Sequence, residues 1–349
     1  MKKTLFVACL ICILPGCTIS TQIRDNHAPA PLYIDSNYHG SCDPEIVWNR
    51  EKQTWYIYYT ARRATREKAS YVGTPIGVIS SKNLVNWKFE GYADFADGSG
   101  ELIEGNKDMP VTFWAPGIIA RKNSLHMYVT YKDNAMPPWG GIGTIRHYST
   151  PLSKPVSGWK LSKEPNFSQP DPIDATIIYH EAKGRYHAYY RVAKGGIQWS
   201  TSPDLTTWKN HGKVKGDVNT LGRKRFGYQE APYVFYFKSF WWMLTDSHKG
   251  LSVYQSQDSI NWKFNGMILK ASGTRTMDTT FGRHPSVAVN NGRAFIFYHV
   301  EPNRIYGKGS LPAEKRTIEQ KKSALQIAEL VVEKNKLKAH RNQSVIIRE

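Results

Sequence analysis

The sequence is short of cysteine, and this shortage limits the kinds of fold that it can adopt. Only four of the 349 residues are cysteines, and Cys9, Cys12 and Cys17 all fall within the first 17 positions. Cys42 is therefore the single cysteine in the body of the chain, which excludes a fold held together by intramolecular disulfides. Stability has to come from packing, for which the 11 tryptophans, 20 tyrosines and 13 phenylalanines supply large side chains.

Long apolar runs are also scarce, and the one marked run lies at the start of the chain. A basic MKK start precedes an apolar stretch over residues 5–14, and LPGC then ends at Cys17. This arrangement is typical of a secretory signal and is too short for a membrane span. Because LPGC resembles the lipobox of bacterial lipoproteins, we expect a signal peptide over residues 1–16, lipid on Cys17 and a polar tether over residues 17–37. The predicted product is an exported lipoprotein, anchored to a membrane in the periplasm or at the cell surface.

Acidic residues are fewer than basic ones, with 29 Asp and Glu against 47 Lys and Arg and a formal charge of +18. Such a balance is compatible with anionic lipid, nucleic acid or acidic polysaccharide as a partner, or with a diffusely basic surface. The sequence contains no RNP-like motif, no zinc-ligand spacing and no basic helix. We therefore expect no nucleic-acid partner.

The body of the chain consists of five copies of one unit. Each copy opens with a short apolar strand, and these are DPEIVW at residue 43, WAPGII at 114, DATIIY at 174, EAPYVF at 230 and HPSVAV at 284. A turn and an aromatic-rich second strand follow, as in WYIYYTA and LHMYVTY, then a third strand and a closing segment with Trp87, Trp159, Trp208 or Trp262. Four strands repeated five times predict an all-β protein, a five-bladed β-propeller over residues 38–342 with a C-terminal tail over 343–349.

The opening residues of the five units should meet at the axis of this propeller, because the first strand of each blade lines the central hole. They are Asp43, Trp114, Asp174, Glu230 and His284. Carboxyls gathered in a partly desolvated pit push each other's pKa values apart, so that one stays protonated while another ionises. Glycoside hydrolysis needs such an acid and base. The alternative is that these acids only bind neighbouring backbone N–H groups.

The opening strands DPEIVW, WAPGII, PIDATIIY and EAPYVFYF, with the SxDxxxWxxxG closing segment, resemble those of the family 43 glycoside hydrolases and relatives such as family 117. The resemblance implies an inverting hydrolase that needs no cofactor. It makes Asp43 the general base, Glu230 the general acid, and Asp174 the residue that orients this acid and raises its pKa. It also makes His284 the axial histidine that in relatives lies beside a structural calcium ion or water.

Further residues are candidates for substrate binding. Trp114 could stack on a sugar ring, and guanidinium groups suit bidentate capture of carboxylate or sulfate. The candidates are Trp114, Arg62, Arg63, Arg191, Asp246 and His284. If several of the arginines point into the pit, the substrate is an acidic or sulfated oligosaccharide; alternatively, each arginine pairs with an acid.

The sequence as a whole predicts an exo-acting glycoside hydrolase that releases terminal sugars from plant or algal polysaccharide fragments. One alternative is a family 117-like α-glycosidase on agar-type oligosaccharides. The family 117 enzymes use a histidine of a His-Glu pair as the acid, whereas here Gln229 precedes Glu230. The other alternative is a non-catalytic carbohydrate-binding propeller, for which an acid–base pair would serve no purpose.

Overall fold

The computed structural model describes residues 25–66, 70–99, 111–133, 135–222, 224 and 228–348. The predicted signal peptide, Cys17 and the first part of the predicted tether lie outside the described residues. Within the described ranges, no helix has both the length and the apolar character that crossing a membrane requires.

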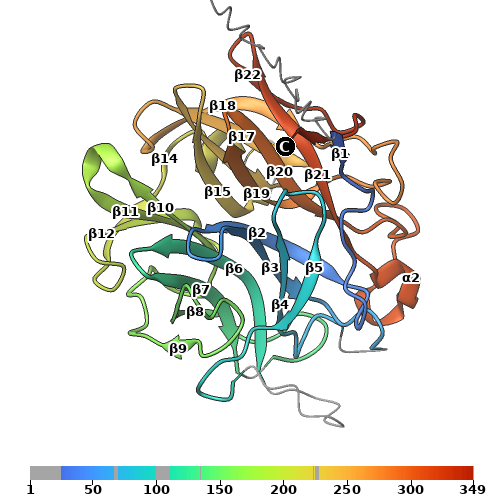
Figure 1. Cartoon of the computed structure of the whole chain (residues 1–349), viewed down its shortest axis with the longest axis horizontal. Coiled ribbons are helices and arrows are strands. Elements are labelled where there is room, and N and C mark those ends of the chain that lie inside the picture. The colour runs from blue at the N-terminus through green and yellow to red at the C-terminus, as the bar shows by residue number, and fades with distance from the viewer. Residues whose placement is uncertain are drawn as a thin grey trace, which may run out of the picture.

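Strands dominate the structure, and five of the six sheets in the described residues lie around a common axis, each with four consecutive antiparallel strands (Figure 1). Blades one to three are β2 (Ser41–Asn49), β3 (Thr54–Ala61), β4 (Ile76–Ser81) and β5 (Lys88–Tyr92); β6 (Thr112–Arg121), β7 (Ser124–Lys132), β8 (Thr144–Pro151) and β9 (Lys160–Leu161); and β10 (Pro172–His180), β11 (Arg185–Val192), β12 (Gly196–Ser202) and β13 (Lys209–Lys213). Blades four and five are β15 (Glu230–Phe237), β16 (Phe240–Asp246), β17 (Leu251–Ser256) and β18 (Asn261–Ile268), extended by β14 (Lys215–Gly216), and β19 (Arg283–Asn290), β20 (Arg293–Val300), β21 (Ala324–Glu333) and β22 (Lys336–Ala339). The predicted five-bladed propeller is confirmed.

The tryptophans of the closing segments hold neighbouring blades together. Each packs edge-on against an aromatic ring in the second strand of the preceding blade, with interplanar angles between 81° and 90°. The four pairs are Trp159 with Tyr58, Trp208 with Tyr128, Trp262 with Tyr189, and Trp87 with Phe297. Such a pair contributes about 0.5–1.5 kcal/mol beyond its buried area. The repeated tryptophan is thus the residue that sets the spacing between blades.

The ring closes through segments that the sequence analysis placed outside the propeller. Strand β1 (Asp25–His27) pairs with β23 (Ile346–Arg348), and the backbone of Leu32 hydrogen-bonds to that of Leu325 in blade five. Leu32 and Asp35 are buried, and Asp35 accepts a hydrogen bond of 2.6 Å from the Tyr59 hydroxyl. Parts of the expected tether over 17–37 and tail over 343–349 are therefore not free segments, because residues 25–37 and 345–348 pack on blades one and five.

Each opening strand begins with a β-bulge, and the bulge corrects the expected alignment of the blades. One residue in each opening strand has a positive φ of between 43° and 57°: Asp43, Ala115, Asp174, Ala231 and His284. The register shifts place Cys42, Trp114, Ile173, Glu230 and Arg283 at the preceding position. The sequence analysis treated Trp114 and Glu230 as equivalent to Asp43. In the structure both lie one residue earlier in the repeat than Asp43 does. The extra residue of a bulge changes the direction in which neighbouring side chains point.

Candidate active site

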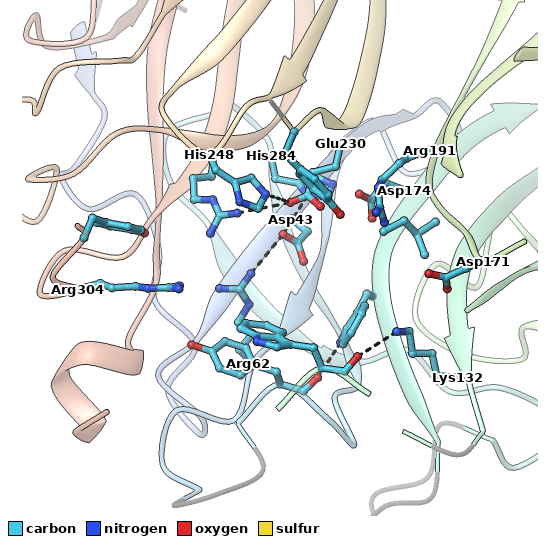
Figure 2. Close-up of a pocket in the computed structure, with 17 residues that line it drawn as sticks. Asp43, Arg62, Lys132, Asp171, Asp174, Arg191, Glu230, His248, His284 and Arg304 are labelled. Carbon is cyan, nitrogen blue, oxygen red and sulfur yellow. Dashed lines mark hydrogen bonds and ion pairs between the residues drawn. The ribbon is translucent and has the colours of Figure 1, made fainter. Parts of the chain in front are cut away.

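A cavity of about 540 Å³ opens where the five opening strands begin (Figure 2). The carboxylates of Asp43, Asp174 and Glu230 line it, as do Trp114, His284, Arg62 and Arg191 among the residues predicted from sequence. The three acids come from β2, β10 and β15, so three separate blades contribute to one site. The predicted convergence of carboxylates is therefore present in the structure.

Asp43 is held as a carboxylate by a histidine and an arginine. Its Oδ1 lies 3.1 Å from Nδ1 of His284 and 3.9 Å from Nη2 of Arg62, and its backbone N–H donates to Nδ1 of His299 at 3.1 Å. Burial favours the neutral acid, but the charge and hydrogen bond of His284 hold the pKa of Asp43 well below its ordinary value. Burial likewise lowers the pKa of His284, and Asp43 outweighs it, raising that pKa to about 9. The two form an ion pair at neutral pH.

Asp174 is the carboxyl in this cavity that retains a proton most readily. Its Oδ2 accepts a hydrogen bond of 3.2 Å from the backbone N–H of Ala231 in the next blade. Burial, with the nearby charges of Glu230 and Asp43, raises the pKa of Asp174 to about 7, against the opposing influence of His284. Near neutral pH this group changes its charge, a behaviour typical of functional carboxyls.

The surroundings of Glu230 lower its pKa, whereas the family resemblance implies a raised one. Its Oε1 lies 2.7 Å from Nε2 of His248 and 3.5 Å from Nη2 of Arg283. Burial raises the pKa of Glu230, but the hydrogen bond and charge of His248 and the charge of Arg283 lower it to about 2. Glu230 and Asp174 interact, so a proton in this part of the cavity belongs to the pair and rests mainly on Asp174.

Behind the cavity, Glu301 binds three arginines. The carboxylate is fully buried, and contacts Arg62 at 2.8 Å, Arg283 at 3.4 Å and Arg304 at 2.5 Å, while the hydroxyl of Tyr306 also donates to it. Although burial favours its neutral form, these cations hold the pKa of Glu301 well below its ordinary value. Arg62 and Arg283 are thus engaged by acids, which is the alternative that the sequence analysis left open for the arginines.

A second set of repeat positions surrounds the cavity, and sequence reasoning found only three of its members, Arg62, Arg191 and Asp246. In the second strand of each blade, Thr60, Thr130, Arg191, Asp246 and His299 pair with the residue before the bulge. Two residues further along the chain stand Arg62, Lys132, Ala193, His248 and Glu301. Three of these line the cavity, and Glu301 lies directly behind it. Aligning the ends of the second strands would have found His248 and Glu301.

Two of the predicted substrate-binding residues do not reach the cavity. Arg63 is buried and donates from Nε and Nη2 to the carbonyl of Val72, at 3.0 and 2.6 Å. Asp246 is buried and binds Nε of Arg283 at 3.0 Å and the backbone N–H of His248 at 2.7 Å. Both predictions are wrong in this respect, because each side chain is used to position neighbouring parts of the chain.

Aromatic rings form one side of the cavity. Trp114 donates from its indole to the carbonyl of Tyr71 at 2.8 Å, and the ammonium of Lys132 lies 4.2 Å from its ring centroid. Trp139, 42% exposed, lies against Tyr71 with ring centroids 3.8 Å apart. One face of each tryptophan ring is thus covered, that of Trp114 by Lys132 and that of Trp139 by Tyr71, and Trp139 is the exposed one at the cavity.

The described residues contain one group of acids and histidine close enough to share a metal ion: Glu230, Asp246 and His248, with ligand atoms within 4.8 Å of one another. Arg283 already donates to both carboxylates of this group, so a positive charge occupies its centre. His284 belongs to no such group in the described part of the chain, and calcium prefers oxygen ligands. Calcium beside His284 therefore stays a prediction.

No protein-family model matches the sequence, and no curated protein matches it. Solved structures do resemble its fold. A thermostable family 43 glycoside hydrolase has a TM-score of 0.61 and 20% identity, covering 89% of this chain and 96% of its own. A family 43 enzyme of Xanthomonas citri complexed with xylotriose has a TM-score of 0.59 and 12% identity, and the match covers 92% of this chain and 93% of that enzyme. An exo-β-1,3-galactanase from Phanerochaete chrysosporium with β-1,3-galactotriose has a TM-score of 0.60 and 10% identity, and the match covers 91% of this chain and 66% of that enzyme. The chain thus has the five-bladed propeller fold of the family 43 glycoside hydrolase structures.

Proposed function

We propose that the protein is an inverting, exo-acting glycoside hydrolase that releases terminal sugars from plant or algal polysaccharide fragments. The observation that carries the proposal is the meeting of Asp43, Asp174 and Glu230, from three different blades, in one cavity of about 540 Å³. That volume lies in the range of small-ligand pockets, which favours a chain end over the middle of a polymer. The similar fold of structures named as complexes with xylotriose and galactotriose supports a sugar substrate.

The chemistry follows from the charge state of each group. Asp43, ionised beside His284 and Arg62, accepts a proton from water, and the water oxygen attacks the anomeric carbon. The glycosidic bond breaks as Glu230 transfers a proton to the leaving oxygen. Since Glu230 is ionised in the free protein, the proton has to come to it as substrate binds, and Asp174 is the interacting carboxyl with a pKa near 7. Each turnover ends with a proton gained by Asp43 and one lost from the Asp174 and Glu230 pair, so Asp43 gives a proton to solvent and Asp174 takes one from solvent before the next turnover.

The stereochemistry of the product tests this proposal. We expect proton NMR spectra, recorded in the first minutes of hydrolysis of an aryl glycoside, to show the anomer opposite to that of the substrate before mutarotation begins. Inversion is expected because Asp43 acts through water rather than by bonding to the sugar. Initial formation of the retained anomer would mean that Asp43 acts as a nucleophile, and the proposed mechanism would be wrong.

His248 offers a second candidate for the proton donor. Its Nε2 lies 2.7 Å from the Glu230 carboxylate, and its side chain is 44% exposed at the cavity. This contact favours a histidine acid paired with a glutamate, the feature that the family 117-like alternative requires, although at position 248 rather than 229. Gln229 itself is buried, and its side chain forms hydrogen bonds with the hydroxyls of Tyr254 and Ser252.

Replacing His248 by glutamine distinguishes the two donors. If Glu230 is the donor, we expect H248Q to hydrolyse a phenyl glycoside within about threefold of the wild-type kcat/KM. Losing the imidazole would remove the main influence that lowers the pKa of Glu230, so this acid would hold its proton more readily. If His248 is the donor, the kcat/KM of H248Q for the phenyl glycoside should fall by about 10²-fold or more. Its kcat/KM for a 2,4-dinitrophenyl glycoside, whose leaving group needs no proton, should fall little.

A further inference from the structure

A second cavity adjoins the catalytic one and has a different charge. Its volume is about 260 Å³, and it is lined by Arg191, Val192, Lys194, Gly196, Asn219, Tyr228 and Gln229. Arg191 and Tyr228 also line the catalytic cavity, so these two side chains form a wall that both cavities share. The catalytic cavity is lined by four carboxylates together with five Lys and Arg side chains, whereas the described lining of the second contains two basic residues and no acid. A negative group is therefore favoured in the second cavity.

Arg191 occupies a repeat position that has a structural task in other blades. The hydroxyls of Thr60 and Thr130 accept hydrogen bonds of 2.9 and 3.1 Å from the bulge N–H groups of Ala115 and Asp174 in the following blades. An arginine side chain has no acceptor, so Arg191 cannot do this for Ala231. The Asp174 carboxylate accepts from Ala231 instead. Arg191 is thereby released from holding the next blade.

The guanidinium of Arg191 is arranged for binding a ligand. It lies 4.5 Å from the ring centroid of Tyr228, and no acid of the described chain forms an ion pair with it. A guanidinium stacked on an aromatic ring keeps its N–H edges available for a bidentate contact with carboxylate or sulfate. Lys132, by contrast, donates to the carbonyls of Trp139 and Gly141 at 3.3 and 3.0 Å.

The position of Glu230 gives the second cavity its place along the substrate. Tyr228 precedes this acid by two residues, and the ring of His248, which binds Glu230, lies 4.8 Å from the ring of Tyr228. In the close-up, Arg191 lies beside Asp174 on the side of the pocket away from Arg304 (Figure 2). A general acid marks the side of the scissile bond where the leaving oxygen lies. The cavity beyond Tyr228 is therefore on the leaving-group side.

We propose that this second cavity binds an anionic sugar on the leaving-group side of the scissile bond, with its carboxylate or sulfate held by Arg191 and drawn further by Lys194. The assignment to the leaving-group side rests on the proposed function. The presence of an anion-binding subsite does not, because it depends only on the lining of the cavity. The inference narrows the substrate from any oligosaccharide to one that is charged next to the bond that is cleaved.

Calorimetric binding to the Glu230→Gln protein, which prevents turnover, tests the proposal. The probes are digalacturonate, neocarrabiose 4-sulfate and neutral galactobiose. We expect R191Q in this background to weaken binding of at least one anionic probe by about 10- to 100-fold, the loss typical of a charge-assisted hydrogen-bonded pair, and to leave galactobiose within about twofold. The affinity of the R191K protein for the anionic probe should lie between those of the proteins with Arg191 and with R191Q, because lysine keeps the charge but loses the bidentate geometry.

The matched control is R185Q, which removes the same charge from the exposed far end of the same strand, outside both cavities. Its binding should be unchanged. Equal binding of the three probes, or equal weakening by R185Q and R191Q with native thermal unfolding, would overturn the proposal. Preference for one anionic probe identifies carboxylate or sulfate. If wild-type protein cleaves no oligosaccharide while Arg191-dependent binding persists, the enzymatic proposal fails and the subsite stands.

Discussion

Replacing Asp43 by alanine or Glu230 by glutamine should each lower kcat/KM for a phenyl glycoside by about 10²- to 10⁴-fold, the usual contribution of a positioned acid or base. Asp43 is the carboxylate kept ionised by His284, and its loss leaves no group to deprotonate the attacking water. Glutamine in place of Glu230 keeps the shape of the side chain but cannot give a proton to the leaving oxygen.

The leaving group separates the two roles. With a 2,4-dinitrophenyl glycoside, E230Q should recover most of its activity because no proton is needed, whereas D43A should stay inactive. Glu45 gives a matched control: it is buried two residues after Asp43, and burial raises its pKa well above the ordinary value, which favours the neutral form that glutamine resembles. E45Q should retain kcat/KM within about twofold. Unchanged hydrolysis by D43A or E230Q would remove the proposed mechanism.

Replacing Glu301 by glutamine should lower the free energy of unfolding by about 3–5 kcal/mol, the usual cost of breaking a buried ion pair by removing one partner. Glu301 is fully buried and bound to Arg62, Arg283 and Arg304, so E301Q leaves three guanidinium groups sharing no central carboxylate. The same change should reduce activity, because Arg62 and Arg283 also contact Asp43 and Glu230.

Urea unfolding at several pH values measures this effect. Because the folded-state pKa of Glu301 lies below its ordinary value of 4.5, its contribution should be complete above that pH and should shrink as the pH falls further. The exposed Glu314 serves as control, and E314Q should change the free energy by less than about 0.5 kcal/mol. An E301Q protein as stable as the wild type at neutral pH would show that the arginines find other partners.

The fold could be predicted from the sequence because its information is local and repeated. Strand alternation, turns and the tryptophan of each closing segment recur in similar order, so their agreement specifies blades without any knowledge of contacts. The exact register was not predictable in the same way. A bulge residue such as Ala115 or Ala231 differs from an ordinary strand residue in its φ value, and an apolar run looks the same with or without it.

The candidate site was found in part for the same reason. Asp43 and Asp174 occupy equivalent positions, and Glu230, one position earlier, still reaches the same cavity. Glu301 and His248 were missed because each follows an apolar strand, where a charged residue resembles the start of a loop. Their importance depends on partners in other blades, such as Arg62, which is 239 residues from Glu301 along the chain.

The pairing of β1 with β23 has a consequence for how the ring is held together. Five blade junctions carry the architecture, and four of them use the same tryptophan contact, including Trp87 on Phe297 between blades one and five. The junction between blades five and one thus has the same tryptophan contact as three others, and the pair of β1 and β23 is added to it. Noncovalent contacts alone join the first and last blades and close the ring. A circularly permuted chain that begins at another blade would therefore bring the same surfaces together.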